Sequence, residues 1–196
     1  MAIKTYEEIE ENDEEKGFDI KSFFKEIIWY VIIFAITFFV CRYIIIVSTV
    51  MSGSMEPTIM TGNTAFSNRL AYKHGEPERG DKIVFLFEET GEYYFKRVIG
   101  LPGEEISFKD DHVYINGELL VEDYLNPVVI TECEKTFKVP EECVFVLGDN
   151  RTNSYDSRFW DNPYVSYDSI RGRYFGQVNF SFEFDVKRRI QKIFNK

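Results

Sequence analysis

The sequence predicts a mostly β protein in which antiparallel sheets, coiled or sandwiched, follow one N-terminal transmembrane helix. Three observations predict this organisation. The first twenty residues are strongly acidic, residues 27–41 form an uncharged and mostly apolar run, and beyond residue 48 short apolar segments alternate with turn residues. The length of 196 residues suits one main domain.

The N-terminal region, residues 1–22, is predicted to be a disordered cytoplasmic tail. Its first twenty residues contain eight acids and two lysines, so they carry −6 of the total net charge of −10. A charged run with so few apolar residues cannot bury enough surface to offset the entropy lost on ordering. The rest of the chain, with a net charge of −4, contains no basic stripe of the kind that binds nucleic acid, and we expect no nucleic-acid partner.

Residues 23–47 are predicted to form a membrane anchor. The run at 27–41 reads IIWYVIIFAITFFVC, and at about 1.5 Å per residue it is shorter than a hydrocarbon layer of about 30 Å. Two phenylalanines extend the run upstream, and residues 43–47 extend it downstream because Arg42 can reach the lipid headgroups.

An uncleaved anchor is favoured over a buried core helix and over a cleaved signal peptide. A core helix so uniformly apolar would be unusual in a small domain, and a signal peptide starts with a short basic segment rather than a long acidic one. Three lysines precede the span and only Arg42 closely follows it, a bias that places the N-terminus in the cytoplasm. We therefore expect a single-pass protein of the cell membrane, with an extracytoplasmic β domain at residues 48–184.

Several short segments of this domain have the composition of β-strands. They are rich in β-branched and aromatic residues and are separated by Gly, Pro, Asn and Asp. The expected strands are residues 82–87, 92–100, 105–108, 112–115 and 143–148. Asn116-Gly117 predicts a hairpin, because a type I′ turn needs a positive φ at both central residues.

The C-terminal residues 185–196 have helical periodicity instead. Val186, Ile190, Ile193 and Phe194 fall on one stripe, and basic residues cover the remaining faces. This segment is predicted to be a basic amphipathic helix, which either closes the domain or lies on anionic lipid.

Neither the cysteines nor the histidines predict a metal or cofactor site. Cys41 lies in the apolar run, whereas Cys133 and Cys143 either pair with each other or stay free. His74 and His112 have no metal-ligand spacing, and they offer little material for a Ser-His-Asp triad. We expect no cofactor and no metal.

Three polar segments, residues 51–58, 93–103 and 148–158, are candidates for chemistry. The first contains a Ser-Gly-Ser turn, and the third is dense in mutually complementary polar side chains. In the second, Lys96 and Arg97 lie within an apolar strand, so alternation predicts that one points inward and the other outward. An inward lysine loses its proton more easily, and its neutral amine can then take a proton from a serine hydroxyl.

In this order behind an anchor, these segments resemble the signal peptidase I family of membrane-bound Ser/Lys proteases. The matching stretches are SGSMEPT at 52–58, RGDKIVF at 79–85, KRVIGLPG at 96–103 and GDNRTNSYDSR at 148–158. The resemblance covers roughly residues 42–172 and implies coiled antiparallel sheets with an exposed apolar face near the membrane. Lys96, in place of a histidine, suggests the prokaryotic type, and the short insert between Gly103 and Gly148 resembles the compact Gram-positive form. On the family pattern, Arg42 ends the span and residues 43–50 form a strand.

The resemblance also implies roles for individual residues. Ser54 matches the nucleophile and Lys96 matches the general base. The hydroxyl of Ser52 and the backbone N–H of Ser54 match the groups that hold the oxyanion, and Ser154 matches the serine that orients the lysine. The supporting positions are matched by Met55, packed close to the lysine, by the charged pair Asp156 and Arg158, and by Asp149 beside that pair.

Partners follow from the same resemblance. The family's substrates are preproteins whose signal peptides carry small residues at positions −1 and −3, so we expect these substrates, the lipid bilayer and the secretion translocon as partners. Residues 159–172 depart from the family pattern and can tune substrate choice.

Two alternative functions are a soluble Ser/Lys self-cleaving protease of the LexA repressor type and a membrane-tethered assembly factor without activity. The anchor disfavours the first, and the retained serines and lysine disfavour the second.

Overall fold

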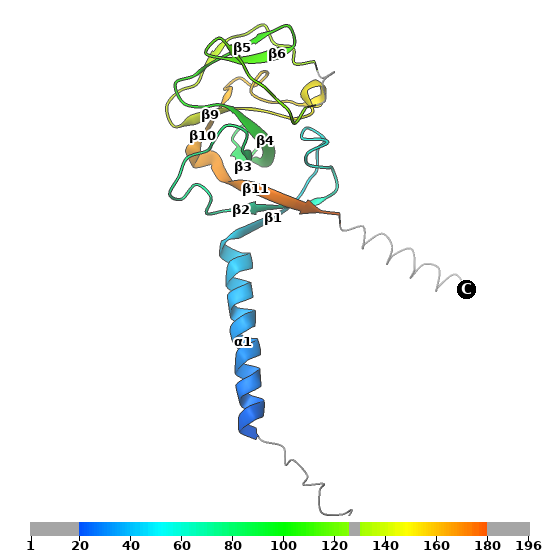
Figure 1. Cartoon of the computed structure of the whole chain (residues 1–196), viewed down its shortest axis with the longest axis vertical. Coiled ribbons are helices and arrows are strands. Elements are labelled where there is room, and N and C mark those ends of the chain that lie inside the picture. The colour runs from blue at the N-terminus through cyan, green and yellow to red at the C-terminus, as the bar shows by residue number, and fades with distance from the viewer. Residues whose placement is uncertain (1–19, 126–129, 180–196) are drawn as a thin grey trace, which may run out of the picture. The chain divides into compact units, whose positions relative to one another are not determined.

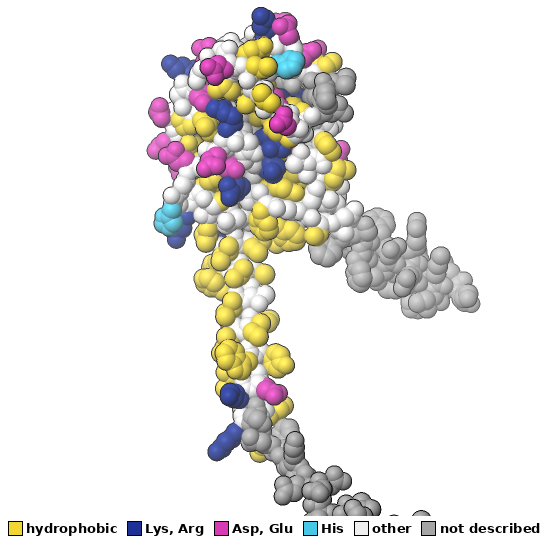
Figure 2. Space-filling model, viewed as in Figure 1, with side chains coloured by type: hydrophobic (Ala, Val, Ile, Leu, Met, Phe, Trp, Pro, Cys, Tyr) yellow, Lys and Arg dark blue, Asp and Glu magenta, His cyan; other side chains and the backbone are white. Residues whose placement is uncertain are grey.

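The computed structural model describes residues 20–125 and 130–179, which fall in two compact units, Met1–Cys41 and Arg42–Lys196. Helix α1, Ile20–Tyr43, accounts for the described part of the first unit. Its surface is mostly apolar (Figure 2). Within the described ranges, one helix is long and apolar enough to cross a membrane, at Phe23–Tyr43, and none of this stretch is buried in protein.

The helix ends earlier than the anchor expected at residues 23–47. Residues Ile45–Thr49 form strand β1, which pairs with β2 (Thr64–Asn68) over its whole length. The sequence of β1 is rich in β-branched residues, which pack well on a sheet, and this favours the strand over another helical turn. The helix therefore ends at Tyr43, before the expected anchor boundary at residue 47, and a strand follows it, as the family pattern implies.

Two further expectations lie wholly or largely outside the described residues. They are the disordered tail, of which residues 1–19 are not described, and the amphipathic helix at 185–196.

Two antiparallel sheets build the second unit (Figure 1). The larger sheet runs in the order β1, β2, β11 (Ile170–Val178), β3 (Lys82–Phe87), β4 (Glu92–Gly100), β9 (Cys143–Leu147) and β10 (Tyr164–Ser166). The smaller sheet runs in the order β7 (Glu118–Leu119), β6 (His112–Ile115), β5 (Glu105–Lys109) and β8 (Phe137–Lys138). Two short 3₁₀ helices, η2 (Arg151–Asn153) and η3 (Tyr167–Ser169), lie in the connections around β10.

The observed fold confirms the predicted class, a mostly β chain with antiparallel sheets behind one N-terminal helix. Strands β3, β4 and β6 coincide with the expected ranges. The hairpin between β6 and β7 is also confirmed, because Asn116 and Gly117 have φ angles of 51° and 85°. Register shifts in β4 and β11 interrupt the larger sheet, and irregularities of this kind bend and twist strands into a coiled form.

Strands β4 and β9 are buried on both faces. Val144 and Val146 belong to one core cluster, whereas Phe145 and Leu147, which alternate with them, belong to another. The neighbouring strand β4 is divided in the same way. A charged side chain on the buried part of either strand must therefore find its partner inside the protein, since burying an unpaired charge is very costly.

Candidate active site

A groove of about 960 Å³ brings parts of the three polar segments together. Its walls are residues 48–55, 92–96 and 152–155, together with Phe159. The predicted site residues that line it are Ser52, Ser54, Met55, Lys96 and Ser154. The other three, Asp149, Asp156 and Arg158, are buried and do not line the groove.

Ser54 lies half-buried on the loop that joins β1 to β2. Its hydroxyl oxygen is 3.4 Å from the hydroxyl oxygen of Ser52. The side-chain amide of Asn150 donates to the carbonyl of Gly53 at 3.0 Å, and the backbone N–H of Asn150 donates to the carbonyl of Ser54 at 3.0 Å. One residue of the 148–158 segment thus fixes two consecutive carbonyls of this loop.

The far half of the same loop is fixed by two residues, Glu56 and Gln177, for which no role was predicted. The carboxylate of Glu56 accepts hydrogen bonds from the hydroxyl and the N–H of Thr61, at 2.7 and 3.2 Å, and these bonds lower the pKa of Glu56. Gln177, on β11, accepts from the N–H of Met60 at 2.9 Å and donates to the carbonyl of Thr58 at 3.2 Å. The loop that carries Ser54 is therefore tied both to itself and to β11.

Lys96 extends from β4 to the groove, and only 3% of the residue is exposed. Its Nζ donates to the hydroxyl of Ser154 at 3.1 Å. Burial lowers the pKa of Lys96 to about 8, an effect that the carboxylate of Asp156 opposes and the guanidinium of Arg158 reinforces. An amine with this pKa is neutral in roughly one molecule in ten at pH 7, whereas an ordinary lysine is almost entirely charged.

Arg97 is buried as well, which corrects the expectation that one of the two neighbouring cations points outward. Only 6% of Arg97 is exposed, because β4 is covered on both faces. Its Nε and Nη2 donate to the two carboxylate oxygens of Asp149 at 2.7 and 2.5 Å, and its Nη1 donates to the carbonyl of Gly80 at 3.0 Å. Paired hydrogen bonds of this kind offset the desolvation of a buried ion pair. Asp149 is thus the ion-pair partner of Arg97.

Asp156 and Arg158 form a second buried ion pair. The Nε and Nη2 of Arg158 donate to the two carboxylate oxygens of Asp156 at 2.9 and 3.0 Å. Asp156 also accepts from the N–H of Gly148 at 3.0 Å, and Arg158 donates to the carbonyl of Arg151 at 2.7 Å. These bonds join the two ends of the 148–158 segment and hold Ser154 between them.

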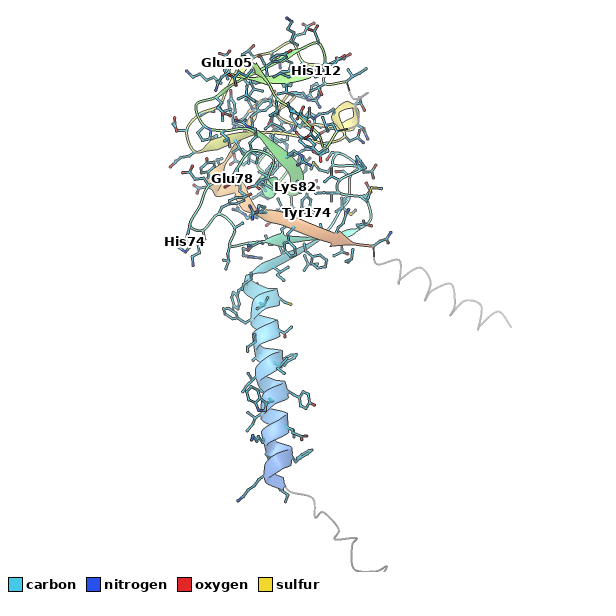
Figure 3. All side chains as sticks on the ribbon, in the orientation of Figure 1. His74, Glu78, Lys82, Glu105, His112 and Tyr174 are labelled. Carbon is cyan, nitrogen blue, oxygen red and sulfur yellow. The ribbon has the colours of Figure 1, made fainter. Side chains whose placement is uncertain are left out.

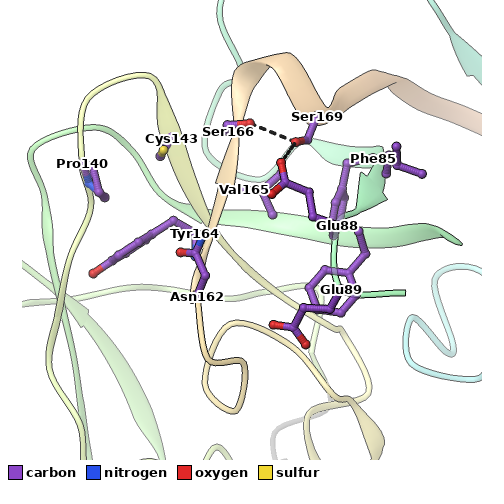
Figure 4. Close-up of a pocket in the computed structure, with 12 residues that line it drawn as sticks. Phe85, Glu88, Glu89, Pro140, Cys143, Asn162, Tyr164, Val165, Ser166 and Ser169 are labelled. Atoms are coloured by element: carbon purple, nitrogen blue, oxygen red, sulfur yellow. Dashed lines mark hydrogen bonds between the residues drawn. The ribbon is translucent and has the colours of Figure 1, made fainter. Parts of the chain in front are cut away.

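A second cavity, of about 260 Å³, has no lining residue in common with the groove (Figure 4). On one wall, the hydroxyl of Ser169 donates to the carboxylate of Glu88 at 3.3 Å and lies 2.9 Å from the hydroxyl oxygen of Ser166. None of the three polar segments contributes to its walls. The cavity is therefore no alternative location for the predicted chemistry.

The histidines and cysteines lie apart from the groove. His74 and His112 are at different ends of the β domain (Figure 3), and neither lines the groove. Cys133 and Cys143 have free thiols, so the pairing left open by the sequence is not formed in this structure. In the part of the chain that the structure describes, no group of three or more His, Cys, Asp or Glu side chains is arranged to hold a metal ion.

Ser54 and Lys96 line the same groove, and the pKa of Lys96 is lowered by burial. A serine hydrolase with an amine as its base needs a serine and a lysine of this kind. Residues 23–178 match the family described as signal peptidase, peptidase S26. The chain therefore belongs to the signal peptidase family.

Two relatives found by sequence agree with this assignment. The chain is 39% identical over 148 residues to a signal peptidase I of Bacillus caldolyticus, a match that covers 67% of this chain and 80% of that protein. It is 37% identical over 130 residues to a probable signal peptidase I-2 of Synechocystis, covering 63% of this chain but only 58% of that protein. A crystal structure of a signal peptidase I from Enterococcus faecalis V583 is 37% identical, with a TM-score of 0.44, over 50% of this chain and 96% of that chain.

Proposed function

We propose that this protein is a membrane-anchored endopeptidase that removes signal peptides from exported preproteins, with Ser54 as the nucleophile and Lys96 as the general base. One observation carries this proposal. The buried amine of Lys96, with its pKa lowered to about 8, lines the same groove as Ser54 and is held by Ser154. The family match, which runs through α1, favours this function over that of a soluble self-cleaving repressor.

In the proposed reaction, the neutral amine of Lys96 takes the hydroxyl proton of Ser54 while the oxygen of Ser54 attacks the scissile carbonyl carbon. The backbone N–H of Ser54 and the hydroxyl of Ser52 donate to the oxyanion that forms. The Lys96 ammonium then gives its proton to the departing amine of the mature protein. Water hydrolyses the ester left on Ser54, with Lys96 again as the base.

The remaining predicted residues have supporting roles in this proposal. Ser154 orients the amine of Lys96, and Met55, of which only 1% is exposed, helps to keep it dry. The ion pairs Arg97–Asp149 and Asp156–Arg158 hold the strand that carries Lys96 and the loop that carries Ser154. Because each pair is buried and two-pronged, it fixes direction as well as distance.

The groove suits an extended peptide. Strand β1 is at the edge of the larger sheet, and its last two residues, Ser48 and Thr49, line the groove. An edge strand presents unpaired backbone groups to which a substrate strand can add, with alternate side chains entering pockets. We propose small residues at positions −1 and −3 of the signal peptide as the side chains selected there.

The proposed location is the cell membrane, with α1 as a single-pass anchor, the N-terminus in the cytoplasm and the β domain on the outer face near the secretion translocon.

The proposed activity is tested by incubating the full-length protein in detergent with a purified preprotein and identifying both products by mass spectrometry. Cleavage after a small residue is expected. A folded wild-type protein that cuts no preprotein would refute the proposal and favour a role in assembly.

The proposed base predicts how the reaction depends on pH. Because only the neutral amine can accept the proton, kcat/KM is expected to rise about tenfold per pH unit below pH 7 and to level off above pH 9, with a midpoint near the Lys96 pKa of about 8. Initial rates on a peptide without titratable side chains measure this. A rate that stays constant between pH 6 and 10 would rule out Lys96 as the titrating base.

Gly148→Ala is expected to damage both the site and the fold. A Cβ at this position would lie 2.2 Å from the hydroxyl oxygen of Ser154 and 2.4 Å from the carbonyl oxygen of Ser54. We expect a loss of about 1–3 kcal/mol of unfolding free energy and, because the site is displaced, about 10- to 100-fold lower kcat. Denaturant unfolding and cleavage rates measure the two effects.

Gly75→Ala is the matched control, because a Cβ at Gly75 meets no atom within 4 Å. Equal activity of the two alanine variants would contradict the close packing around Gly148.

A further inference from the structure

Two side chains of the connection between β7 and β8, Glu122 and Tyr124, contact residues that support the site. The two are joined by a hydrogen bond from the Tyr124 hydroxyl to the Glu122 carboxylate. Both also contact Arg151, which is 29 and 27 positions further along the chain. They lie outside the four family-like stretches, so the resemblance gives them no role.

Arg151 is the first point of contact, and its guanidinium is saturated with hydrogen bonds. Its Nε donates to the carbonyl of Gly148 at 3.0 Å. Its Nη1 donates to the carboxylate of Glu122 at 3.0 Å and to the hydroxyl of Thr131 at 3.1 Å. Its Nη2 donates to the carboxylate of Glu122 at 2.5 Å and lies 3.4 Å from the hydroxyl oxygen of Tyr124. None of the Arg151 side chain is exposed. Without the Glu122 carboxylate, Arg151 would lose its ion-pair partner while buried, and breaking a buried ion pair is strongly destabilising.

The second point of contact is on β4. The guanidinium carbon of Arg97 lies 3.7 Å from the ring centroid of Tyr124, a close cation–π contact. Arg97 directly follows Lys96 in the chain, and Arg151 opens η2, the 3₁₀ helix that ends one residue before Ser154. The connection therefore touches both segments that carry the Lys96–Ser154 hydrogen bond.

We propose that Glu122 and Tyr124 are positioning residues of the proteolytic site, which act through the two arginines. Glu122 holds Arg151 and with it η2 and the loop that presents Ser154. Tyr124 covers the guanidinium of Arg97 and steadies the strand that presents Lys96. This inference rests on the proposed function, and it makes Glu122 and Tyr124 part of the active-site support.

Glu122→Gln tests the inference, because glutamine keeps the size of the side chain and removes its charge. In the full-length protein with a preprotein substrate, kcat is expected to fall about 10- to 100-fold while KM stays within about threefold, since a displaced base impairs the reacting geometry rather than substrate binding. Glu122→Asp, which keeps the charge on a shorter side chain, is expected to recover part of the lost kcat. Tyr124→Phe, which keeps the ring beside Arg97, is expected to lose less than Glu122→Gln.

Glu104→Gln is the matched control. Glu104 forms an equally short ion pair of 2.5 Å, with Arg79, but unlike Glu122 it contacts neither Arg97 nor Arg151. This variant should keep the wild-type kcat. A wild-type kcat in Glu122→Gln, a change in KM alone, or an equal loss of kcat in the control would each overturn the inference.

Circular dichroism of each variant separates misplacement from unfolding. If Glu122→Gln does not fold, Glu122→Asp and Tyr124→Phe decide, and a wild-type kcat in both overturns the inference. If the wild-type protein folds but cuts no preprotein, the proposed function itself fails, and this result is distinct from any loss confined to the variants.

Discussion

Ser54→Ala is expected to lower the rate of signal-peptide cleavage by at least about 10⁴-fold. Alanine removes the hydroxyl that would attack the scissile carbonyl but keeps the backbone contacts between this loop and Asn150. Activity that remains would come from substrate binding and from stabilisation of the oxyanion. Cleavage of a purified preprotein, followed over hours by mass spectrometry, measures a loss of this size.

Ser107→Ala provides the control for this change. Ser107 lies on β5 of the smaller sheet and does not line the groove, so its loss should leave the cleavage rate at the wild-type value. A rate for Ser54→Ala within tenfold of wild type would show that another residue is the nucleophile.

Lys96→Met is expected to cause a loss of similar size. Methionine fills much of the same volume at a position that is only 3% exposed, but it has no amine to accept the proton. Groups that act as a unit lose their effect together, so the Ser54→Ala/Lys96→Met double variant should be no slower than either single variant. The same preprotein assay, run on all three variants, measures both expectations.

Lys82→Met is the matched control for the lysine. Lys82, on the adjacent strand β3, is also partly buried, with its amine 5.8 Å from the ring centroid of Tyr174 (Figure 3), and burial lowers its pKa too. It does not line the groove, so this variant should keep the wild-type rate. Losses that multiply in the Ser54→Ala/Lys96→Met double variant would contradict a shared catalytic step.

The sequence predicted those parts of the fold that depend on local pattern. Strand β4 and the Asn116-Gly117 hairpin coincide with the structure because side-chain alternation and positive φ are set by neighbouring residues. The end of α1 could not be predicted in this way. An apolar run that continues past Arg42 suits either a helix or a strand. The β-branched residues at 45–49 favour a strand, and pairing with β2 completes it.

The sequence pointed to those site residues that lie in the three polar segments. Ser54, Lys96 and Ser154 line one groove, and the roles that the resemblance gives them stay predictions. The burial of Arg97 was not predicted, because it requires both faces of β4 to be covered, and alternation within one strand carries no information about the second face.

The residues that support the site were the hardest to predict. Asn150 is one of several polar residues in its segment, and nothing local shows that it reaches Gly53, 97 positions away. Glu122 and Tyr124 lie in a stretch that looks like an ordinary connection, and their contacts with Arg151 depend on how the two sheets come together. Such long-range partners leave no periodic signal in a single sequence.

The shortness of strand β1 bears on the range of clients that the proposed peptidase could serve. The strand has five residues, and only its last two line the groove. A substrate added at this edge would be held by its main chain over a few residues next to the cut, with about every second side chain inspected. The rest of the signal peptide would not contact β1, so a single enzyme could process preproteins whose signal peptides are otherwise unrelated.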